Sequence, residues 1–352
     1  MRLRLLADDL SGALDSAAEF AALCGPVPLA LDGPPLAAMD SATREAPRAL
    51  ASARVAALAP HLAGADIAFK KLDSLLRGQV ATELAACWAT GAFRHLVLAP
   101  AFPAQGRVTR AGRVLSRQGA GWRPHGDLGA LLRGEGLRAA AGDPLAPLPD
   151  GIAIFDAETE ADLARVAALG ATARGPVLWA GSGGLARALA AAAPVAFDRA
   201  VAHPVLGCFG SDRAETAAQL AACGPALLAV TAGDAPRIAA RLARGPALLS
   251  VALPSGLHRA EAAARIAATW AALLPALPRP ATLLAAGGET LRAACLAVGA
   301  RGLLATGLAE PGVPRAALVG GTWDGVAVIS KSGAFGGPSL WRDLLFPSGD
   351  PA

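Results

Sequence analysis

The stretch Leu3–Phe20 reads LRLLADDLSGALDSAAEF, an apolar run followed by an acidic pair and an alanine-rich run. The apolar run Leu3–Ala7 is bounded by polar residues, which predicts a buried strand of a parallel sheet. Ser11 is a good N-cap for the alanine-rich run, and the predicted helix continues to Leu23, before a Cys-Gly-Pro sequence. This stretch therefore predicts a strand, an acidic turn and a helix.

The acidic pair, Asp8 and Asp9, follows the carboxyl end of the predicted strand. Ligands of open α/β sheets bind outside the carboxyl ends of the strands, so these carboxylates can reach a substrate hydroxyl or a bound metal. The alternative is that Asp9 and Asp15 only stabilise the start of the helix, by roughly 0.3–1 kcal/mol each through the helix dipole. The spacing alone does not separate these interpretations.

Strand-like and helical runs alternate along most of the 352 residues. This alternation is typical of βαβ units, and the length favours about two domains. The predicted fold class is α/β, with two α/β domains, mainly parallel sheets and an interdomain cleft. We place the two domains at residues 1–200 and 201–352. Four of the predicted strands are Asp66–Lys71, His95–Ala99, Val205–Phe209 and Thr282–Ala286.

Two segments of the first half are harder to assign from their patterns. Arg44–Leu58 is predicted as an amphipathic helix that Pro47 can break. Between Gly106 and Pro149 the pattern weakens into Gly, Arg and Pro, which predicts long loops with one short helix near Leu128–Arg133.

Composition narrows the classes of function. Neither an apolar run of 18 residues nor a basic-then-apolar leader is visible, so a cytoplasmic protein is expected. The five cysteines are never spaced CxxC, which favours reduced core residues. The net charge is +4, but arginines are scattered and aromatics make up only 4% of residues. We therefore expect no nucleic acid or membrane partner and an anionic small-molecule substrate; a homo-oligomer is compatible with the sequence.

The segment FKKLDSLLRG concentrates charge directly after a predicted strand. Neighbouring side chains of a strand point to opposite faces, so one lysine of the pair faces a given cleft, and Lys71 is nearer the carboxyl end. Arg77 can fork onto a carboxylate. The alternative is a solvated turn in which Asp73 and Arg77 only pair with each other.

Two glycine-rich turns follow predicted strands in the second half. Gly287-Gly288-Glu289-Thr290 opens a helix, where backbone N–H groups favour a phosphate, and Ser332–Gly337 follows another strand. The sequence contains neither GxxxxGK[ST] nor a GxGxxG that opens a helix, which argues against a P-loop ATPase or a standard dinucleotide dehydrogenase.

Together these segments resemble the four-carbon acid sugar kinase family, the ATP-dependent kinases of threonate, erythronate and 3-oxo-tetronate. The matching segments occur in the family's order and cover most of the chain. They are ADDLSGALD (7–15), KKLDSLLRG (70–78), APAFPAQGR (99–107), DAETEADL (156–163), GSGGLARALA (181–190), AGGET (286–290) and KSGAFGG (331–337).

The resemblance implies an acid-sugar-binding domain at residues 1–200 and a nucleotide-binding domain at residues 201–352. It also implies phosphoryl transfer from ATP, with Mg²⁺, to the terminal hydroxyl of a four-carbon sugar acid. It places Asp8, Lys71, Asp73 and Arg77 at the substrate, and Asp9 and Asp15 in catalytic roles. Its ATP-binding residues are Ser211, Gly287, Gly288, Glu289, Thr290 and Gly333. The metal ligands stay unassigned.

Two other functions stay open from the sequence. The segment 108–124 is rich in Arg and Gly where the family pattern predicts a Glu-Thr pair, so a catalytically weakened relative that senses a sugar acid or nucleotide is the alternative. A dehydrogenase without a P-loop is the third.

Overall fold

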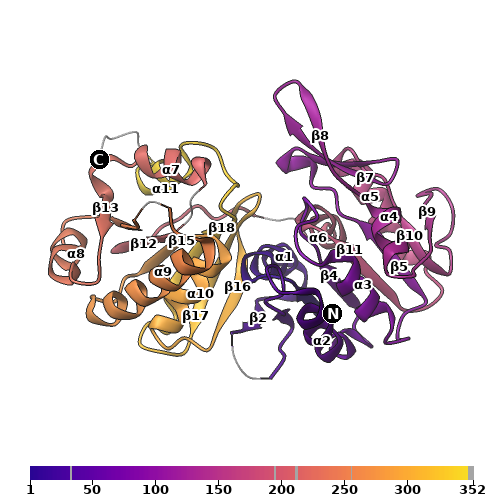
Figure 1. Cartoon of the computed structure of the whole chain (residues 1–352), viewed down its shortest axis with the longest axis horizontal. Helices are drawn as coiled ribbons and strands as arrows, with labels where there is room; N and C mark the ends of the chain where they lie inside the picture. The colour runs from indigo at the N-terminus through magenta and orange to yellow at the C-terminus, as the bar shows by residue number, and fades with distance from the viewer. Residues whose placement is uncertain (32–33, 194–195, 211–212, 255, 348–352) are drawn as a thin grey trace. The chain divides into compact units, whose positions relative to one another are not determined.

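The computed structural model describes residues 1–31, 34–193, 196–210, 213–254 and 256–347. The chain divides into two compact units, each an α/β layer structure (Figure 1). Unit 1 comprises Met1–Leu29 and Pro34–Val195, and unit 2 comprises Ala30–Gly33 and Ala196–Ala352. The boundary between the units lies close to the predicted domain boundary after residue 200.

Unit 1 contains a parallel sheet in the strand order β2-β3-β1-β4-β11-β5-β10-β9. The strands are β1 (Leu3–Ala7), β2 (Val27–Ala30), β3 (Ala38–Asp40), β4 (Ile67–Lys71), β5 (His95–Ala99), β9 (Ala139–Ala141), β10 (Gly151–Ile154) and β11 (Val177–Gly181). The helices are α1 (Leu10–Cys24), α2 (Arg48–Leu58), α3 (Val80–Trp88), α4 (Leu128–Gly134), α5 (Glu160–Ala168) and α6 (Gly183–Ala190).

The central strands of unit 1 are buried on both faces, as their apolar runs predict. All residues of β4 and β5 are buried, and β1 has the predicted bounds. On one face Phe20 of α1 packs edge-to-face on Phe69 of β4, with ring centroids 5.5 Å apart. The predicted α/β class with mainly parallel sheets is confirmed. The sheet thus brings the carboxyl ends of β1 and β4 together.

The prediction of loops between Gly106 and Pro149 is wrong for its first part. This part forms a three-stranded antiparallel sheet of β6 (Arg107–Arg110), β7 (Arg113–Gln118) and β8 (Gly121–Asp127). Val108 and Val114 are buried, and the guanidinium groups of Arg110 and Arg117 lie 5.7 and 5.4 Å from the Trp122 ring. The arginines of this segment, whose abundance suggested loops, therefore belong to a sheet, where two of them cover an aromatic side chain.

Helix α2 begins at Arg48 instead of at Arg44. Pro47 precedes it in an extended conformation, with φ −58° and ψ 149°, and a proline disfavours helical geometry in the residue before it. The segment from Ser41 to Arg44 is anchored instead by hydrogen bonds to the backbone oxygens of Ala7 and Asp8. This arrangement brings Arg44 to the end of β1.

Unit 2 contains a sheet in the order β13-β14-β12-β15-β18-β17-β16, in which β16 and β17 run antiparallel to their neighbours. Its strands are β12 (Val205–Phe209), β13 (Leu227–Val230), β14 (Ala247–Val251), β15 (Thr282–Ala286), β16 (Gly302–Glu310), β17 (Val313–Val319) and β18 (Ala327–Lys331). Its helices are α7 (Ala214–Ala221), α8 (Ala235–Leu242), α9 (Arg259–Leu273), α10 (Gly288–Ala297) and α11 (Leu340–Leu345).

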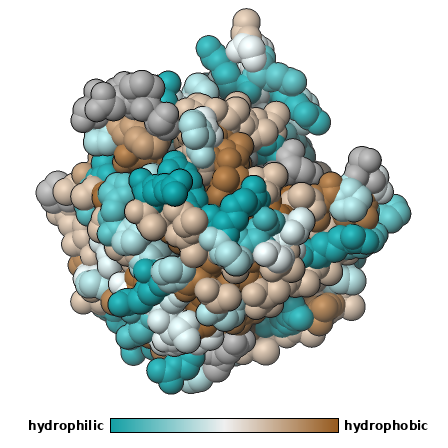
Figure 2. All heavy atoms as spheres, turned by 90° about the vertical axis from the view of Figure 1, so that its left-hand side faces the viewer, coloured by the Kyte–Doolittle hydropathy of each residue, from teal (hydrophilic) through white to brown (hydrophobic). Residues whose placement is uncertain are grey.

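The outer helix α8 is amphipathic. It buries Ile238 and Leu242 and leaves Arg237 on the outside, paired with Asp234 at 3.0 Å. Figure 2 views the molecule from the side on which α8 and β13 lie in Figure 1, and hydrophilic and hydrophobic residues are interspersed over that face. In the described part of the chain, no helix is both long and apolar enough to span a membrane.

One ion pair lies wholly inside unit 1. Lys70 of β4 donates to Glu83 of α3 over 2.7 Å, and Thr43 donates to the same carboxylate over 2.6 Å. Burial disfavours the charged lysine, but Glu83 outweighs it and raises the pKa of Lys70. This pair links the sheet to α3 and to the segment that carries Arg44.

We expect Lys70→Met to lower the free energy of unfolding by about 3–5 kcal/mol, because it leaves the Glu83 carboxylate buried without its cation. The control is Arg94→Met, which removes the exposed pair between Arg94 and Asp150 and should change the free energy of unfolding far less, because solvent screens an exposed pair. Urea denaturation measures both. Similar losses in the two variants would contradict the assignment of Lys70 as a buried structural cation.

Candidate active site

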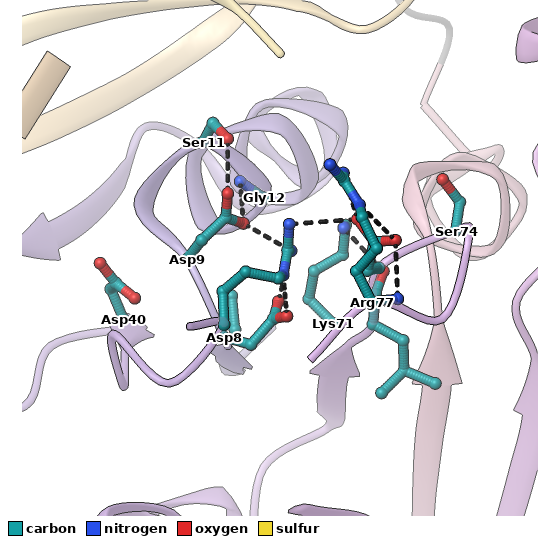
Figure 3. Close-up of polar contacts among 12 residues, drawn as sticks. Asp8, Asp9, Ser11, Gly12, Asp40, Lys71, Ser74 and Arg77 are labelled. Atoms are coloured by element: carbon teal, nitrogen blue, oxygen red, sulfur yellow. Dashed lines mark hydrogen bonds and ion pairs between the residues drawn. The ribbon is translucent and has the colours of Figure 1, made fainter. Parts of the chain in front are cut away.

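A single guanidinium group holds three carboxylates at the carboxyl ends of β1 and β4. Arg44 contacts Asp8 through Nε and Nη2, Asp9 through Nη2 at 2.9 Å, and Asp73 through Nη1 at 3.1 Å (Figure 3). Burial disfavours the charged form of Asp8, but Arg44 outweighs burial and lowers the pKa of Asp8. The Asp8 carboxylate is therefore ionised, and Arg44 holds all three carboxylates in position.

The three carboxylates differ in exposure. The side chains of Asp8 and Asp73 are 3% and 5% exposed, whereas that of Asp9 is 23% exposed. Asp9 is therefore the member of this cluster that a ligand can touch. Asp8 and Asp73 serve mainly to hold Arg44.

The N-cap of α1 is Asp9, so the prediction of Ser11 as N-cap is wrong. Asp9 is extended, with φ −147° and ψ 158°, and its Oδ1 accepts from the Gly12 N–H over 2.9 Å. Ser11 lies inside the helix and donates to Asp9 Oδ2 over 2.8 Å (Figure 3). The helix start thus orients the carboxylate, which remains available on its exposed side.

Lys71 lies against the first turn of α1, on the face of the sheet opposite to Lys70. Its Nζ donates to the Leu72 carbonyl over 2.8 Å, and within the described residues it forms no ion pair. A Cβ at Gly12 would lie 2.6 Å from Asp9 Oδ1 and 3.1 Å from Lys71 Nζ. Glycine at this position therefore lets the ammonium group approach the helix.

The turn after β4 is built around Asp73. Its Oδ1 accepts from the N–H groups of Leu75 and Arg77, and the Arg77 side chain forks onto both oxygens, with 2.6 Å between Nη2 and Oδ2 (Figure 3). Burial disfavours ionisation, but Arg77 and Arg44 outweigh it and lower the pKa of Asp73. The pairing of Asp73 with Arg77 that the sequence left open is present.

Asp15 is buried in the second turn of α1. Burial raises the pKa of Asp15 from 3.8 to about 6, against the attraction of Lys71, Arg187 and Arg107. Its Oδ1 has no hydrogen-bond partner among the described residues, and a Cβ at Gly183 would lie 2.8 Å from its Oδ2. Asp15 therefore holds an unused acceptor, away from the exposed cluster around Asp9.

Two arginines near these carboxylates were absent from the predicted site. Arg44 was assigned to a helix, and Arg107 ends a motif that carried the family resemblance. Arg107 is buried, donates to Ser74 over 2.5 Å, and has its pKa lowered to about 10 by burial. Three acidic side chains after two neighbouring strands imply a nearby cation, which is the signal that could have directed attention to Arg44.

In unit 2, three parallel strands end side by side at residues 209, 286 and 331. Phe209 pairs with Ala286, and Ala286 pairs with Lys331. The Gly287 N–H then donates to the Lys331 carbonyl over 2.9 Å. The two glycine-rich turns that the sequence singled out are therefore neighbours.

The N-cap of α10 is Gly287, with φ 91°. It has no side chain to cap the first turn, which contains Gly288, Glu289 and Thr290. Backbone N–H groups at such a helix end attract an anion. Ser211, predicted at the nucleotide, lies outside the described residues, and Gly333 lies in the turn after β18.

Lys331 lies at the end of β18 and is the first residue of the segment KSGAFGG. It was not among the predicted site residues. It is buried, and its Nζ donates to the carbonyls of Gly333 and Ser332 over 3.0 and 3.2 Å. Burial lowers the pKa of Lys331 to about 8.

All five cysteines are free, and among the described residues no three His, Cys, Asp or Glu side chains are grouped as metal ligands.

Two family models match this chain. A sugar-binding N-terminal domain matches residues 3–126 and 113–189, and a nucleotide-binding C-terminal domain matches residues 185–340. These matches define a two-domain protein that joins a sugar-binding domain to a nucleotide-binding domain.

Two relatives carry the comparison further. A D-threonate kinase of Cupriavidus necator is 34% identical over 96% of this chain and 96% of its own length. A D-threonate kinase of Bordetella bronchiseptica is 31% identical over 94% of each chain. The chain belongs to the four-carbon acid sugar kinase family.

Two solved structures share the fold. A crystal structure from Salmonella typhimurium LT2 has a TM-score of 0.72 at 19% identity and covers 98% of this chain and 99% of that chain. A Haemophilus influenzae protein has a TM-score of 0.67 at 18% identity, with 97% and 99% covered. The arrangement of strands and helices is thus common to distant chains.

We expect Asp15→Asn to stabilise the protein at pH 8. The raised pKa means that the folded state binds the proton more tightly, so stability falls as pH rises from about 3.8 through about 6. At about 1.36 kcal/mol per pKa unit, the ionised carboxylate costs up to about 3 kcal/mol at pH 8. Urea denaturation should give a larger gain for the variant at pH 8 than at pH 4.5.

The control for this prediction is Asp150→Asn. Asp150 is exposed, and a hydrogen bond from Arg94 lowers its pKa, so its replacement should bring no gain at pH 8. An effect of Asp15→Asn that is independent of pH would contradict the buried, weakly acidic state of Asp15.

Proposed function

We propose that this protein is an ATP- and Mg²⁺-dependent kinase that phosphorylates the terminal hydroxyl of D-threonate or a closely related four-carbon sugar acid. The identity of more than 30% to two D-threonate kinases, over nearly the whole chain, carries this proposal. The charged cluster of unit 1 and the glycine-rich turns of unit 2 support it chemically.

Unit 1 is suited to a small anion with hydroxyl groups. Lys71 brings an ammonium group that forms no ion pair within 4.0 Å among the described residues, so it is the proposed partner of the substrate carboxylate. Arg77 is 44% exposed beyond its bond to Asp73 and adds positive charge at the same edge. In this role Asp73 and Asp8 bind substrate only indirectly, through the arginines that they hold.

Asp9 is the proposed contact for the attacking hydroxyl, because its carboxylate is the accessible one. A carboxylate is a weak base, so it chiefly orients the O–H group by accepting its hydrogen bond. The hydroxyl oxygen forms the new bond to the γ-phosphorus, the bond to the bridging β–γ oxygen breaks, and ADP departs. The hydroxyl proton passes to Asp9 or to solvent. Asp15, buried behind it, is proposed to tune the charge around Lys71.

The nucleotide is proposed to bind the two glycine-rich turns of unit 2. The start of α10 at Gly288, Glu289 and Thr290 offers N–H groups, and the turn containing Gly333 lies next to it. Phosphoryl transfer depends on positioning and on neutralising negative charge, which these groups supply without covalent chemistry.

Mg²⁺ is proposed to arrive with the nucleotide. The carboxylates of Asp8, Asp9 and Asp73 already bind Arg44, so they do not form a cage made of protein ligands alone. Mg²⁺ usually keeps several waters and is bound through substrate phosphates with one or two carboxylates. When bound, it would neutralise charge on the transferred phosphoryl group.

A substrate screen tests this proposal. ATP consumption is followed with D-threonate, L-threonate, the erythronates and the 3-oxo-tetronates, with and without Mg²⁺. We expect ADP formation with D-threonate or one close isomer, and its loss when Mg²⁺ is chelated. Ligand binding in calorimetry without ADP formation from any of these acids would contradict a kinase.

Asp9→Asn tests the role of the accessible carboxylate. We expect kcat/KM for the confirmed substrate to fall by about 10²–10⁴, the usual contribution of a positioned acid or base. Asparagine is an equally good N-cap, so the thermal unfolding temperature should change little. The surface variant Asp150→Asn is the matched control. A kcat/KM within about twofold of the parent protein would show that Asp9 does not act on the hydroxyl.

A further inference from the structure

The loop Ser332–Gly337 of unit 2 is held from one side by α7. Gln219 is buried, and its Nε2 lies 3.1, 3.0 and 2.9 Å from the carbonyl oxygens of Phe335, Gly336 and Gly337. Thr216, one turn earlier on the same face of α7, donates to the Gly333 carbonyl over 2.9 Å. One amide group and one hydroxyl thus bind four carbonyls of one short loop.

These bonds determine where the N–H groups of the loop point. In a trans peptide the C=O of one residue and the N–H of the next point in opposite directions. The carbonyls of Gly333, Phe335 and Gly336 face α7, so the N–H groups of Ala334, Gly336 and Gly337 face away from it. Within the described part of the chain, none of these three N–H groups has a protein acceptor.

Gly336 completes this arrangement. Its φ is +83°, a left-handed conformation that brings successive N–H groups to one side, as in anion-binding nests. A Cβ there would lie 2.5 Å from Leu340 Cδ2 and 3.3 Å from Gln219 Nε2. Both the backbone angle and the close approach of Gln219 therefore require glycine.

We propose that Gln219 is a positioning residue that orients the N–H groups of Ala334, Gly336 and Gly337 toward a phosphate of the nucleotide. The inference rests on the proposed ATP site and deepens it, because Gln219 faces the carbonyl side of the loop and acts through the peptide planes. Its Oε1 is buried without a partner, so the amide serves this loop alone. Thr216 performs the same function at the start of the loop.

Gln219→Leu is the central variant, because leucine has a similar size but donates no hydrogen bond. Gln219→Glu places a carboxylate against the same carbonyl oxygens, and Gln118→Leu, at an exposed position of β7, is the matched control. Calorimetry measures the dissociation constants of ATP and of adenosine. Hydrogen exchange measures the N–H groups of Phe335, in the loop, and Leu340, the first residue of α11, which donate to the carbonyls of Ser332 and Gly337.

We expect Gln219→Leu and Gln219→Glu to weaken ATP binding at least tenfold and adenosine binding less than twofold, because adenosine lacks the phosphates. Exchange at Phe335 and Leu340 should accelerate in both variants of Gln219 and stay unchanged in Gln118→Leu. Equal losses for ATP and adenosine would indicate general damage to unit 2 and overturn the inference. Unchanged ATP affinity or unchanged exchange would overturn it as well.

Failure of the proposed function gives a different result. A parent protein that binds neither ATP nor adenosine contradicts the kinase. The hydrogen-exchange measurement at Phe335 and Leu340 needs no nucleotide. It therefore still shows, in the ligand-free protein, whether Gln219 holds the loop in its conformation.

Discussion

The structure of unit 1 depends on the charge balance around Arg44. Two parallel strands end side by side, and each is followed by acidic residues that would repel one another. One guanidinium group bound by Asp8, Asp9 and Asp73 removes that repulsion and makes the cluster rigid. Because two of these carboxylates are buried, the side chain of Asp9 is the most exposed of the three.

In unit 2 the polar groups at the strand ends belong mainly to the backbone. Its strand ends carry glycine-rich turns, and the donors that hold the turn after β18, Gln219, Thr216 and Lys331, all bind carbonyl oxygens. Binding the carbonyls on one side leaves N–H groups on the other. Unit 1 therefore offers side-chain charge, and unit 2 offers N–H groups and a helix end. A sugar acid and a triphosphate need these two kinds of recognition.

The parts of the fold that the sequence predicts well are those set by local pattern. Apolar runs such as Leu3–Ala7 need burial on both faces, so they form central strands. The acidic and glycine-rich turns follow such runs in the sequence, so their place at the carboxyl ends of strands is predicted too. The errors arise where a distant partner decides. Ser11 is a good N-cap by type, but Asp9, held by Arg44, takes that position. The sheet of β6–β8 forms because its three segments pair with one another and bury Val108 and Val114; the arginines among these residues gave no sign of that pairing.

The two neighbouring lysines of β4 show what the alternation of side chains along a strand can and cannot predict. Alternation requires Lys70 and Lys71 to face opposite sides, and the structure agrees: one binds Glu83 in the interior and the other lies beside Asp9 and Gly12. Alternation does not say which lysine meets a buried carboxylate, because Glu83 comes from a helix that packs on one face only. Glu83 pairs with Lys70, whereas Lys71 forms no ion pair within 4.0 Å among the described residues. The division of roles between two identical side chains thus follows from helix packing, which no local sequence window contains.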